Sequence, residues 1–218
     1  MEDPVQRHPT RAEQLDILVT VIAELAADGD AVLDLGCGVG YVAHLLLARR
    51  PTLGITGVDR SAEALAKARA NLAAAGNVSL IEGDLEQIDA MVLPRARYRF
   101  VLSALTFHDL SERGKRAVIS KAAEVLSADG VFLLYDRLRL TESALFPLQQ
   151  SIWRRIAREH GRGMRTAASF GDYLADLGSD NRPASLEEYL AWFREAGLAP
   201  ACLHLHGNVA LIAGARAA

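Results

Sequence analysis

The chain has 218 residues, half of them hydrophobic and 23% charged, with a formal net charge of −3. This size and composition fit one globular domain spanning 1–218, and the charge gives no general attraction to nucleic acid or to a membrane. No apolar run reaches membrane-spanning length, and the start lacks the apolar core of a signal peptide. Two cysteines form neither a disulfide framework nor a metal site, so we expect a cytoplasmic protein without a metal.

Helix and strand patterns alternate along most of the chain. Amphipathic spacing and capping residues predict helices over 11–27, from Tyr41, from Ser61 to Gly76, over 111–127 and from Ser185 to Gly197. Short apolar runs predict strands over 31–35, 55–59, 78–82, 98–104 and 131–136, the last behind a turn at Asp129-Gly130, and a terminal hairpin of 202–206 and 209–213. The expected fold class is therefore α/β, with a mainly parallel seven-stranded sheet, helices on both faces and a C-terminal antiparallel hairpin.

The segment 137–183 interrupts this alternation and predicts a helical insertion after the fifth strand. Within it, residues 153–165 carry five arginines. One interpretation is a lid that covers the substrate site and recognises an anionic substrate, because guanidinium groups match carboxylate or phosphate. The alternative is a solvated helix whose Trp153 and Ile156 pack inward.

The stretch Val32–Gly40 predicts a nucleotide-type cofactor site. An apolar strand reaches Asp34 and is followed by glycines at 36, 38 and 40 and then by a helix. Alternating glycines permit positive φ and let a ligand approach bare main chain, and the helix start directs free N–H groups into the same space. Cys37 fits here as a small side chain, and nothing in the sequence marks it as a nucleophile.

Two cofactors fit this loop when it is taken alone. Residues 38–43 satisfy the dinucleotide pattern G-x-G-x-x-G/A, with Asp59 about 20 residues further on. Against a dinucleotide, Asp34 would repel a pyrophosphate but suits a ligand with an ammonium group. Residues 82–85 can place the carboxylate of Asp84 on an adenine amino group, and no second mononucleotide-binding half follows. An NAD(P)-binding oxidoreductase stays an open alternative.

The segments 32–40, 57–59, 82–85, 98–110 and 189–198 together resemble the class I S-adenosylmethionine-dependent methyltransferases. The resemblance covers nearly the whole chain outside the insertion, and it departs at Arg99, where relatives often carry Asp. It implies a Rossmann-like fold with S-adenosyl-L-methionine as cofactor and S-adenosyl-L-homocysteine as product. The implied activity is methyl transfer to an oxygen, nitrogen or carbon of a small molecule.

Carried over residue by residue, the resemblance implies a cofactor site built from the glycine loop, the strand ends and the first helix. The implied contacts are Gly36, Cys37, Gly38 and Gly40 under the methionine part, Asp34 at its amino group, Asp59 on the ribose hydroxyls, Arg60 on the adenine face, Asp84 and the Leu85 N–H on the adenine edge, Ser103 and Ala104 at the sulfonium, and Arg11 at the carboxylate. Each carboxylate also has a structural alternative, because Asp at a strand end or turn commonly caps the following backbone.

His108 is the catalytic candidate, since it follows the fourth strand at the carboxyl edge of the sheet, where ligands bind in such folds. It would take a proton from an acceptor hydroxyl, or alternatively only close its loop through hydrogen bonds. The expected partner is a small-molecule methyl acceptor, with an anionic one suggested by the arginine run, rather than nucleic acid. Two further alternatives stay open: a tRNA-modification-related enzyme that uses a variant S-adenosylmethionine, and a non-catalytic cofactor-binding protein.

Overall fold

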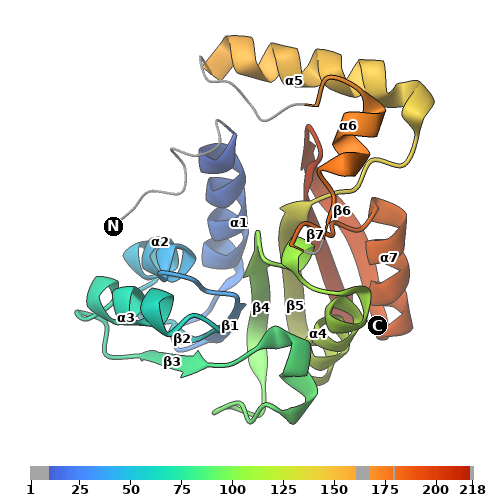
Figure 1. Ribbon diagram of the computed structural model, residues 1–218. Coiled ribbons are helices and arrows are strands. Elements are labelled where there is room, and N and C mark those ends of the chain that lie inside the picture. Colours follow the sequence, from blue (N-terminus) through green and yellow to red (C-terminus); the bar gives the residue numbers. More distant parts are fainter. Residues whose placement is uncertain (1–9, 161–166, 179, 217–218) are drawn as a thin grey trace.

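The computed structural model describes residues 10–160, 167–178 and 180–216, which form a seven-stranded sheet in the order β3-β2-β1-β4-β5-β7-β6 (Figure 1). The strands are β1 (Ala31–Leu35), β2 (Gly54–Asp59), β3 (Val78–Glu82), β4 (Tyr98–Ala104), β5 (Leu126–Arg137), β6 (Leu198–His206) and β7 (Val209–Arg216). The pairs among β1 to β5 are parallel, whereas β7 runs antiparallel to both β5 and β6. The predicted mainly parallel sheet with a terminal hairpin is confirmed.

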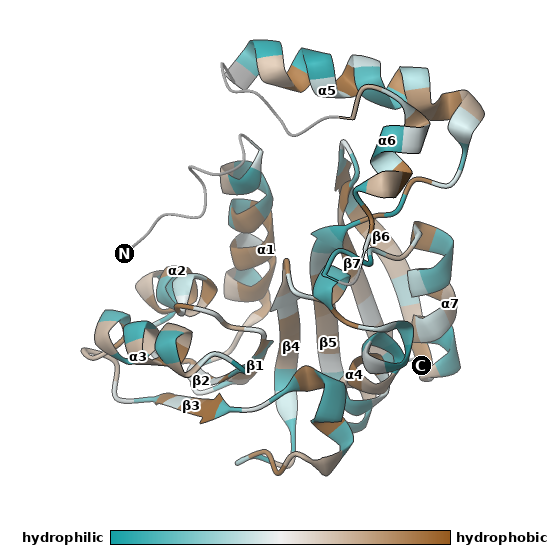
Figure 2. Ribbon diagram, viewed as in Figure 1, coloured by the Kyte–Doolittle hydropathy of each residue, from teal (hydrophilic) through white to brown (hydrophobic). Residues whose placement is uncertain are grey.

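Helices cover both faces of this sheet. They are α1 (Arg11–Leu25), α2 (Tyr41–Arg49), α3 (Ala62–Asn71), α4 (Glu112–Val125), α5 (Phe146–His160), α6 (Phe170–Ala175) and α7 (Leu186–Glu195), with short 3₁₀ segments at 85–90, 107–109 and 143–145. Side chains of α1 and α2 form one core against the sheet, and those of α4 and α7 form the other. In Figure 2, α5 and α7 alternate between hydrophilic and hydrophobic residues, as expected for helices with one packed face.

Alternation along β1 decides which side chains reach which face. Leu33 and Leu35 join the core under α4 and α7, whereas Val32 joins the core under α1 and α2. Asp34 shares the parity of Val32 and is only 2% exposed. The strand thus carries a carboxylate into a buried position beside the helix that follows it.

Three predicted boundaries are wrong by four residues or more, and one of them is the start of β6, which lies at Leu198 rather than at residue 202. The helix α3 ends at Asn71, before Gly76, and the Asn71 side chain donates to the Val39 carbonyl at 2.9 Å. Strand β5 begins at Leu126, so Asp129 and Gly130 lie inside the strand rather than in a turn. Its early residues pair with the start of β4 across a register shift, and Arg99 of β4 holds the Asp129 carboxylate at 3.1 Å.

The insertion is helical, as predicted, and packs through aromatic residues of its own. Phe146 and Trp153 of α5 meet Tyr173 of α6 in a separate cluster, and Trp153 Nε1 donates to Asn208 in the hairpin turn at 3.4 Å. Figure 1 shows α5 apart from the sheet. Its arginines at 154, 155 and 158 are exposed while Ile156 is buried, as the solvated-helix interpretation requires. Arg162 and Arg165 lie outside the described residues.

No helix in the described part of the chain is long and apolar enough to cross a membrane. Within residues 10–160, 167–178 and 180–216, no three His, Cys, Asp or Glu side chains gather in a way that could hold a metal ion.

The start of α7 gives a test of local stability. Ser185 accepts from the Glu188 N–H at 3.2 Å, and the Glu188 carboxylate accepts from the Ser185 N–H at 2.6 Å, which forms a capping box. Ser185→Ala should lower the free energy of unfolding by about 1 kcal/mol in urea denaturation. Ser120→Ala, at an exposed position inside α4, is the matched control and should leave stability unchanged or slightly higher. Equal effects of the two substitutions would contradict the assigned cap.

Candidate active site

The glycine loop at the end of β1 has the backbone that its sequence predicts. Gly36, Gly38 and Gly40 have φ of 80°, 52° and 77°, all in the left-handed region. A Cβ on Gly36 would collide with the Thr106 side chain, whereas one on Gly38 would meet no described atom within 4 Å. Gly40 precedes α2 without a side-chain cap, so the first N–H groups of that helix remain available to a ligand.

A cavity of about 390 Å³, called here the glycine-loop cavity, opens beside this backbone. Its lining comes from the loop and from the ends of neighbouring strands: Leu15, Asp34, Gly36, Cys37, Gly38, Val39, Tyr41, Val42, Asp59, Ala104, Leu105 and Thr106. Asp34 Oδ2 is buried without a hydrogen-bond partner in the described structure. Burial, and then the charge of Asp59, raise the pKa of Asp34 from 3.8 to about 7. A buried, unpaired carboxylate of this kind is stabilised by a cation.

Asp59 ends β2 between two cavities. Its Oδ2 accepts from the Gly38 N–H at 2.8 Å, and its Oδ1 accepts from the Ser61 N–H at 2.9 Å. The cap of α3 is Ser61, whose hydroxyl accepts from the Ala64 N–H at 3.1 Å. Asp59 therefore holds the glycine loop, and each carboxylate oxygen has a further lone pair for a ligand hydroxyl.

A second cavity, of about 170 Å³, continues from the first and is called here the Asp84 cavity. It is lined by Gly36, Asp59, Arg60, Gly83, Asp84, Leu85, Thr106, Asp109 and Leu110. Asp84 Oδ1 accepts from the Glu86 N–H at 3.0 Å and caps the 3₁₀ segment. The turn interpretation of Asp84 thus holds, and its side chain also borders the cavity. The two cavities share Gly36, Asp59 and Thr106, so they adjoin, and we refer to them together as the cleft.

Two predicted contacts, Ser103 and Arg11, lie elsewhere than expected, whereas Cys37 lines the cavity beside the loop. Ser103 is fully buried, and its hydroxyl donates to the Leu35 carbonyl at 2.6 Å, so it links β4 to β1 and lines neither cavity. Arg11 lines a different cavity, beside His108. Cys37 lines the glycine-loop cavity but is 7% exposed, and burial raises the pKa of its thiol, which keeps it neutral and a poor nucleophile.

His108 is held by a carboxylate that the sequence did not single out. Asp136, at the end of β5 and 2% exposed, lies 2.6 Å from His108 Nδ1 and accepts from the His108 backbone N–H at 2.7 Å. With the proton on Nδ1, this contact is a hydrogen bond donated to Asp136, and it leaves Nε2 as the ring nitrogen without a proton. Asp109 lies 3.4 Å from Nε2. The sequence could have indicated Asp136 as a site residue, because it ends a predicted strand at the carboxyl edge of the sheet.

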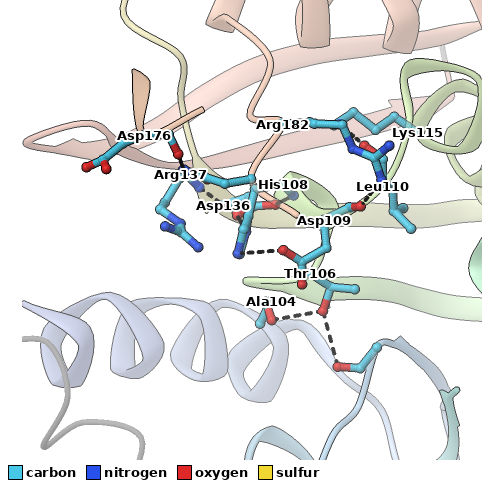
Figure 3. A network of polar contacts seen from close by, with 12 residues as sticks. Ala104, Thr106, His108, Asp109, Leu110, Lys115, Asp136, Arg137, Asp176 and Arg182 are labelled. Carbon is cyan, nitrogen blue, oxygen red and sulfur yellow. Dashed lines mark hydrogen bonds and ion pairs between the residues drawn. The ribbon is translucent and has the colours of Figure 1, made fainter. Parts of the chain in front are cut away.

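The loop that carries His108 is fixed from two further sides (Figure 3). The Arg182 N–H donates to the His108 carbonyl at 2.6 Å, and the Arg182 guanidinium donates to the Asp109 carbonyl. Lys115 of α4, 2% exposed, donates to the Leu110 carbonyl. Burial lowers the pKa of Lys115 to about 8, with the Arg182 charge acting in the same direction. The end of the insertion and α4 thus hold the histidine in place.

A third cavity, of about 290 Å³ and called here the His108 cavity, lies next to that loop. It is lined by Arg11, Leu105, His108, Tyr135, Arg137 and Val209. Leu105 also lines the glycine-loop cavity and has φ of 56°, which is unfavourable for a leucine. The strained residue therefore lies where the cofactor-type cleft meets the His108 cavity. No periodic or capping signal in the sequence pointed to it.

Comparison with known proteins agrees with this geometry. Residues 32–130 match the family described as a methyltransferase domain. A trans-aconitate 2-methyltransferase of Methylobacterium nodulans is 30% identical over 167 residues, which cover 76% of this chain and 56% of that protein. The ribosomal RNA small subunit methyltransferase C of Klebsiella pneumoniae is 32% identical over 55% of this chain and 33% of its own length. These matches support a class I S-adenosylmethionine-dependent methyltransferase domain.

The fold of this methyltransferase is shared with solved structures. An O-methyltransferase family protein from Burkholderia thailandensis superposes with a TM-score of 0.68 at 20% identity, covering 94% of this chain and 57% of that one. The chain thus spans 56% of the trans-aconitate 2-methyltransferase, 33% of the ribosomal RNA methyltransferase and 57% of the O-methyltransferase family protein. That family uses S-adenosylmethionine as its methyl donor.

The cleft of the methyltransferase fits this donor. S-adenosylmethionine carries an ammonium and a sulfonium, and the buried Asp34 oxygen without a partner faces the space beside the glycine loop. The open side of Gly38 gives an extended ligand access to bare main chain. Asp59 and Asp84 follow along the same cleft in the order in which ribose and adenine would lie.

Asp34 should make cofactor binding depend on pH. Its carboxyl group ionises only above about pH 7, and the ionised form is the one that attracts a cation. The affinity for S-adenosylhomocysteine, measured by calorimetry, should therefore rise between about pH 6 and about pH 8, and Asp34→Asn should abolish that rise. Because the folded pKa exceeds 3.8, the ligand-free protein should also lose stability as pH rises from 3.8 towards 7, and the Asn variant should not. Parallel pH profiles of the two proteins would contradict this role.

Asp59 should carry much of the ribose contact. Asp59→Ala removes an acceptor that can serve two hydroxyls, so the affinity for S-adenosylhomocysteine should fall at least about tenfold. Thermal-shift titration would show this as a lost rise in Tm, whereas NAD(P) should stabilise neither protein. Asp89→Ala, an exposed carboxylate on the 3₁₀ segment, is the control. Unchanged binding by Asp59→Ala would refute the assigned contact.

Proposed function

We propose that the protein transfers a methyl group from S-adenosylmethionine to an oxygen of a small molecule, with His108 as the general base. The observation that carries this proposal is the Asp136–His108 pair at 2.6 Å beside a 290 Å³ cavity, which meets the glycine-loop cavity at Leu105. A histidine oriented by a buried carboxylate is suited to accept a proton from a hydroxyl.

His108 would act through Nε2. With Nδ1–H donating to Asp136, Nε2 takes the hydroxyl proton while the acceptor oxygen gains the methyl group. The electron pair of the broken carbon–sulfur bond stays on sulfur, which yields S-adenosylhomocysteine. The bound donor supplies an electrophilic methyl group on a sulfonium. Asp136 then stabilises the imidazolium, and Asp109, at 3.4 Å, adds a second negative charge.

A small acceptor is favoured over nucleic acid by the size of the His108 cavity and by the net charge of −3. Among the relatives, a trans-aconitate methyltransferase acts on a small molecule, whereas others act on ribosomal RNA. The insertion joins this site through its two ends, Arg137 and Arg182. We extend the proposal to the insertion as a cover over the acceptor.

A carboxylate acceptor is a second candidate, because two arginines line the His108 cavity and a relative is a trans-aconitate methyltransferase. A carboxylate is already a nucleophile and needs no base. Its product would be a methyl ester, which alkali hydrolyses, whereas a methyl ether survives.

His108→Gln should lower kcat for a hydroxyl acceptor by about 10²- to 10⁴-fold while leaving the affinity for S-adenosylhomocysteine unchanged. The acceptor would come from a panel of hydroxylated metabolites incubated with isotope-labelled S-adenosylmethionine and followed by mass spectrometry. His44→Gln, exposed on α2, is the control and should retain full activity. If the His108 variant has an unaltered kcat and the product is hydrolysed by alkali, methylation of a hydroxyl is refuted and methylation of a carboxylate is supported. A panel without any methylated product would count against the activity itself.

A further inference from the structure

The His108 cavity is distinguished by its charge. Arg11, the first residue of α1, and Arg137, the last residue of β5, both line it, and its other lining residues carry no carboxylate. The positive end of the α1 dipole lies at the same place, since Arg11 begins that helix. The cavity therefore has a cationic wall built from two elements far apart in sequence.

Arg137 has no ion-pair partner in the described part of the structure. Its backbone N–H donates to Asp136 Oδ1 at 2.7 Å, but its guanidinium has no recorded carboxylate contact. By contrast, the nearby Arg139 binds Glu188 at 2.8 Å, and Arg182 lies 3.8 Å from Glu86. Arg137 is exposed on the cavity side, and Figure 3 shows it projecting near the His108 ring. Its charge is thus available to a ligand.

The Arg11 charge reaches the same space. Arg11 and Tyr135 line the same cavity. Burial raises the pKa of the Tyr135 phenol, and the charge of Arg11 opposes that rise. The Tyr135 hydroxyl itself donates to Gln14 Oε1 at 2.8 Å and is held at the cavity wall. Asp136 and Asp109 both contact the His108 ring, at 2.6 Å from Nδ1 and 3.4 Å from Nε2.

We propose that Arg137 and Arg11 form a carboxylate-binding subsite for the methyl acceptor, so that the acceptor is a hydroxycarboxylate whose hydroxyl meets His108 Nε2. Guanidinium groups bind carboxylates through paired, charge-assisted hydrogen bonds, which fix orientation as well as position. The inference rests on the proposed function for the methyl transfer, but the subsite itself is a binding property of the cavity.

A carboxylate in this subsite has two conceivable sources, the acceptor and the methionine end of the cofactor. The acceptor is favoured because His108 lines the same cavity. The glycine-loop cavity, where Asp34 lies, shares only Leu105 with it. Binding measurements with each ligand separate the two sources.

The test uses calorimetry on the full chain saturated with S-adenosylhomocysteine. The probes are 2-hydroxybenzoate, 2-hydroxyphenylacetate and 2-hydroxybutyrate, each beside its neutral amide. At least one carboxylate should bind about tenfold or more tighter than its amide, and Arg137→Gln should remove that preference while leaving amide binding unchanged. Arg11→Gln should act in the same direction. Arg69→Gln, exposed on α3, makes the same change in charge away from the cavity and should have no effect.

Equal binding of carboxylate and amide across the panel would overturn the subsite, as would an Arg137→Gln variant that keeps the preference. Weaker binding of S-adenosylhomocysteine to Arg137→Gln would assign the charge to the cofactor instead and also overturn the proposal. The Tm of each variant without ligand verifies folding. Arg137-dependent carboxylate binding without methyl transfer would refute the proposed function and leave the subsite standing. Methylation of neutral acceptors that is unaffected by Arg137→Gln would refute the subsite and leave the proposed function standing.

Discussion

The parallel order of β1 to β5 is the constraint on which the whole site depends. Parallel strands end at one edge, so every residue that follows a strand is delivered to the same side of the sheet. Asp34 and the glycines end β1, Asp59 ends β2, His108 follows β4, and Asp136 ends β5. Residues separated by about half of the chain meet there without any long-range signal in the sequence. Had one of these strands been antiparallel, its residue would lie at the opposite edge.

The two parts of the cleft have opposite charge. The cofactor side is bordered by carboxylates, of which Asp34 is buried with an oxygen that has no recorded partner. The His108 cavity, which we propose for the acceptor, is bordered by Arg11 and Arg137. Leu105, with its strained backbone, separates the two. This division suits a cationic methyl donor and an anionic acceptor, each attracted to its own end, and it leaves an apolar junction where the methyl group would pass.

The strands and the cofactor loop were predictable because their signals are local. Strands β1, β3 and β4 have the predicted bounds, since short apolar runs between polar turns decide them. The end of α3 and the start of β5 were not predictable. The side chain of Asn71, the last residue of α3, donates to the Val39 carbonyl in the glycine loop, and Asp129 in β5 pairs with Arg99 of β4. Both boundaries thus have partners that are distant in sequence. The partner of the Ser103 hydroxyl, the Leu35 carbonyl, is equally distant in sequence and carries no local signal.

The sequence by itself determined the alternation of elements, the glycine loop and the identity of Asp34, Asp59 and His108 as candidates, because periodicity, backbone conformation and residue type are properties of short segments. Only the tertiary structure decided what those residues face. It paired His108 with Asp136, placed Arg11 in the lining of the His108 cavity rather than of the glycine-loop cavity, and left the described arginines of α5 in solvent. Side chains meet according to strand order and helix packing, and these arise from contacts between residues far apart in the chain.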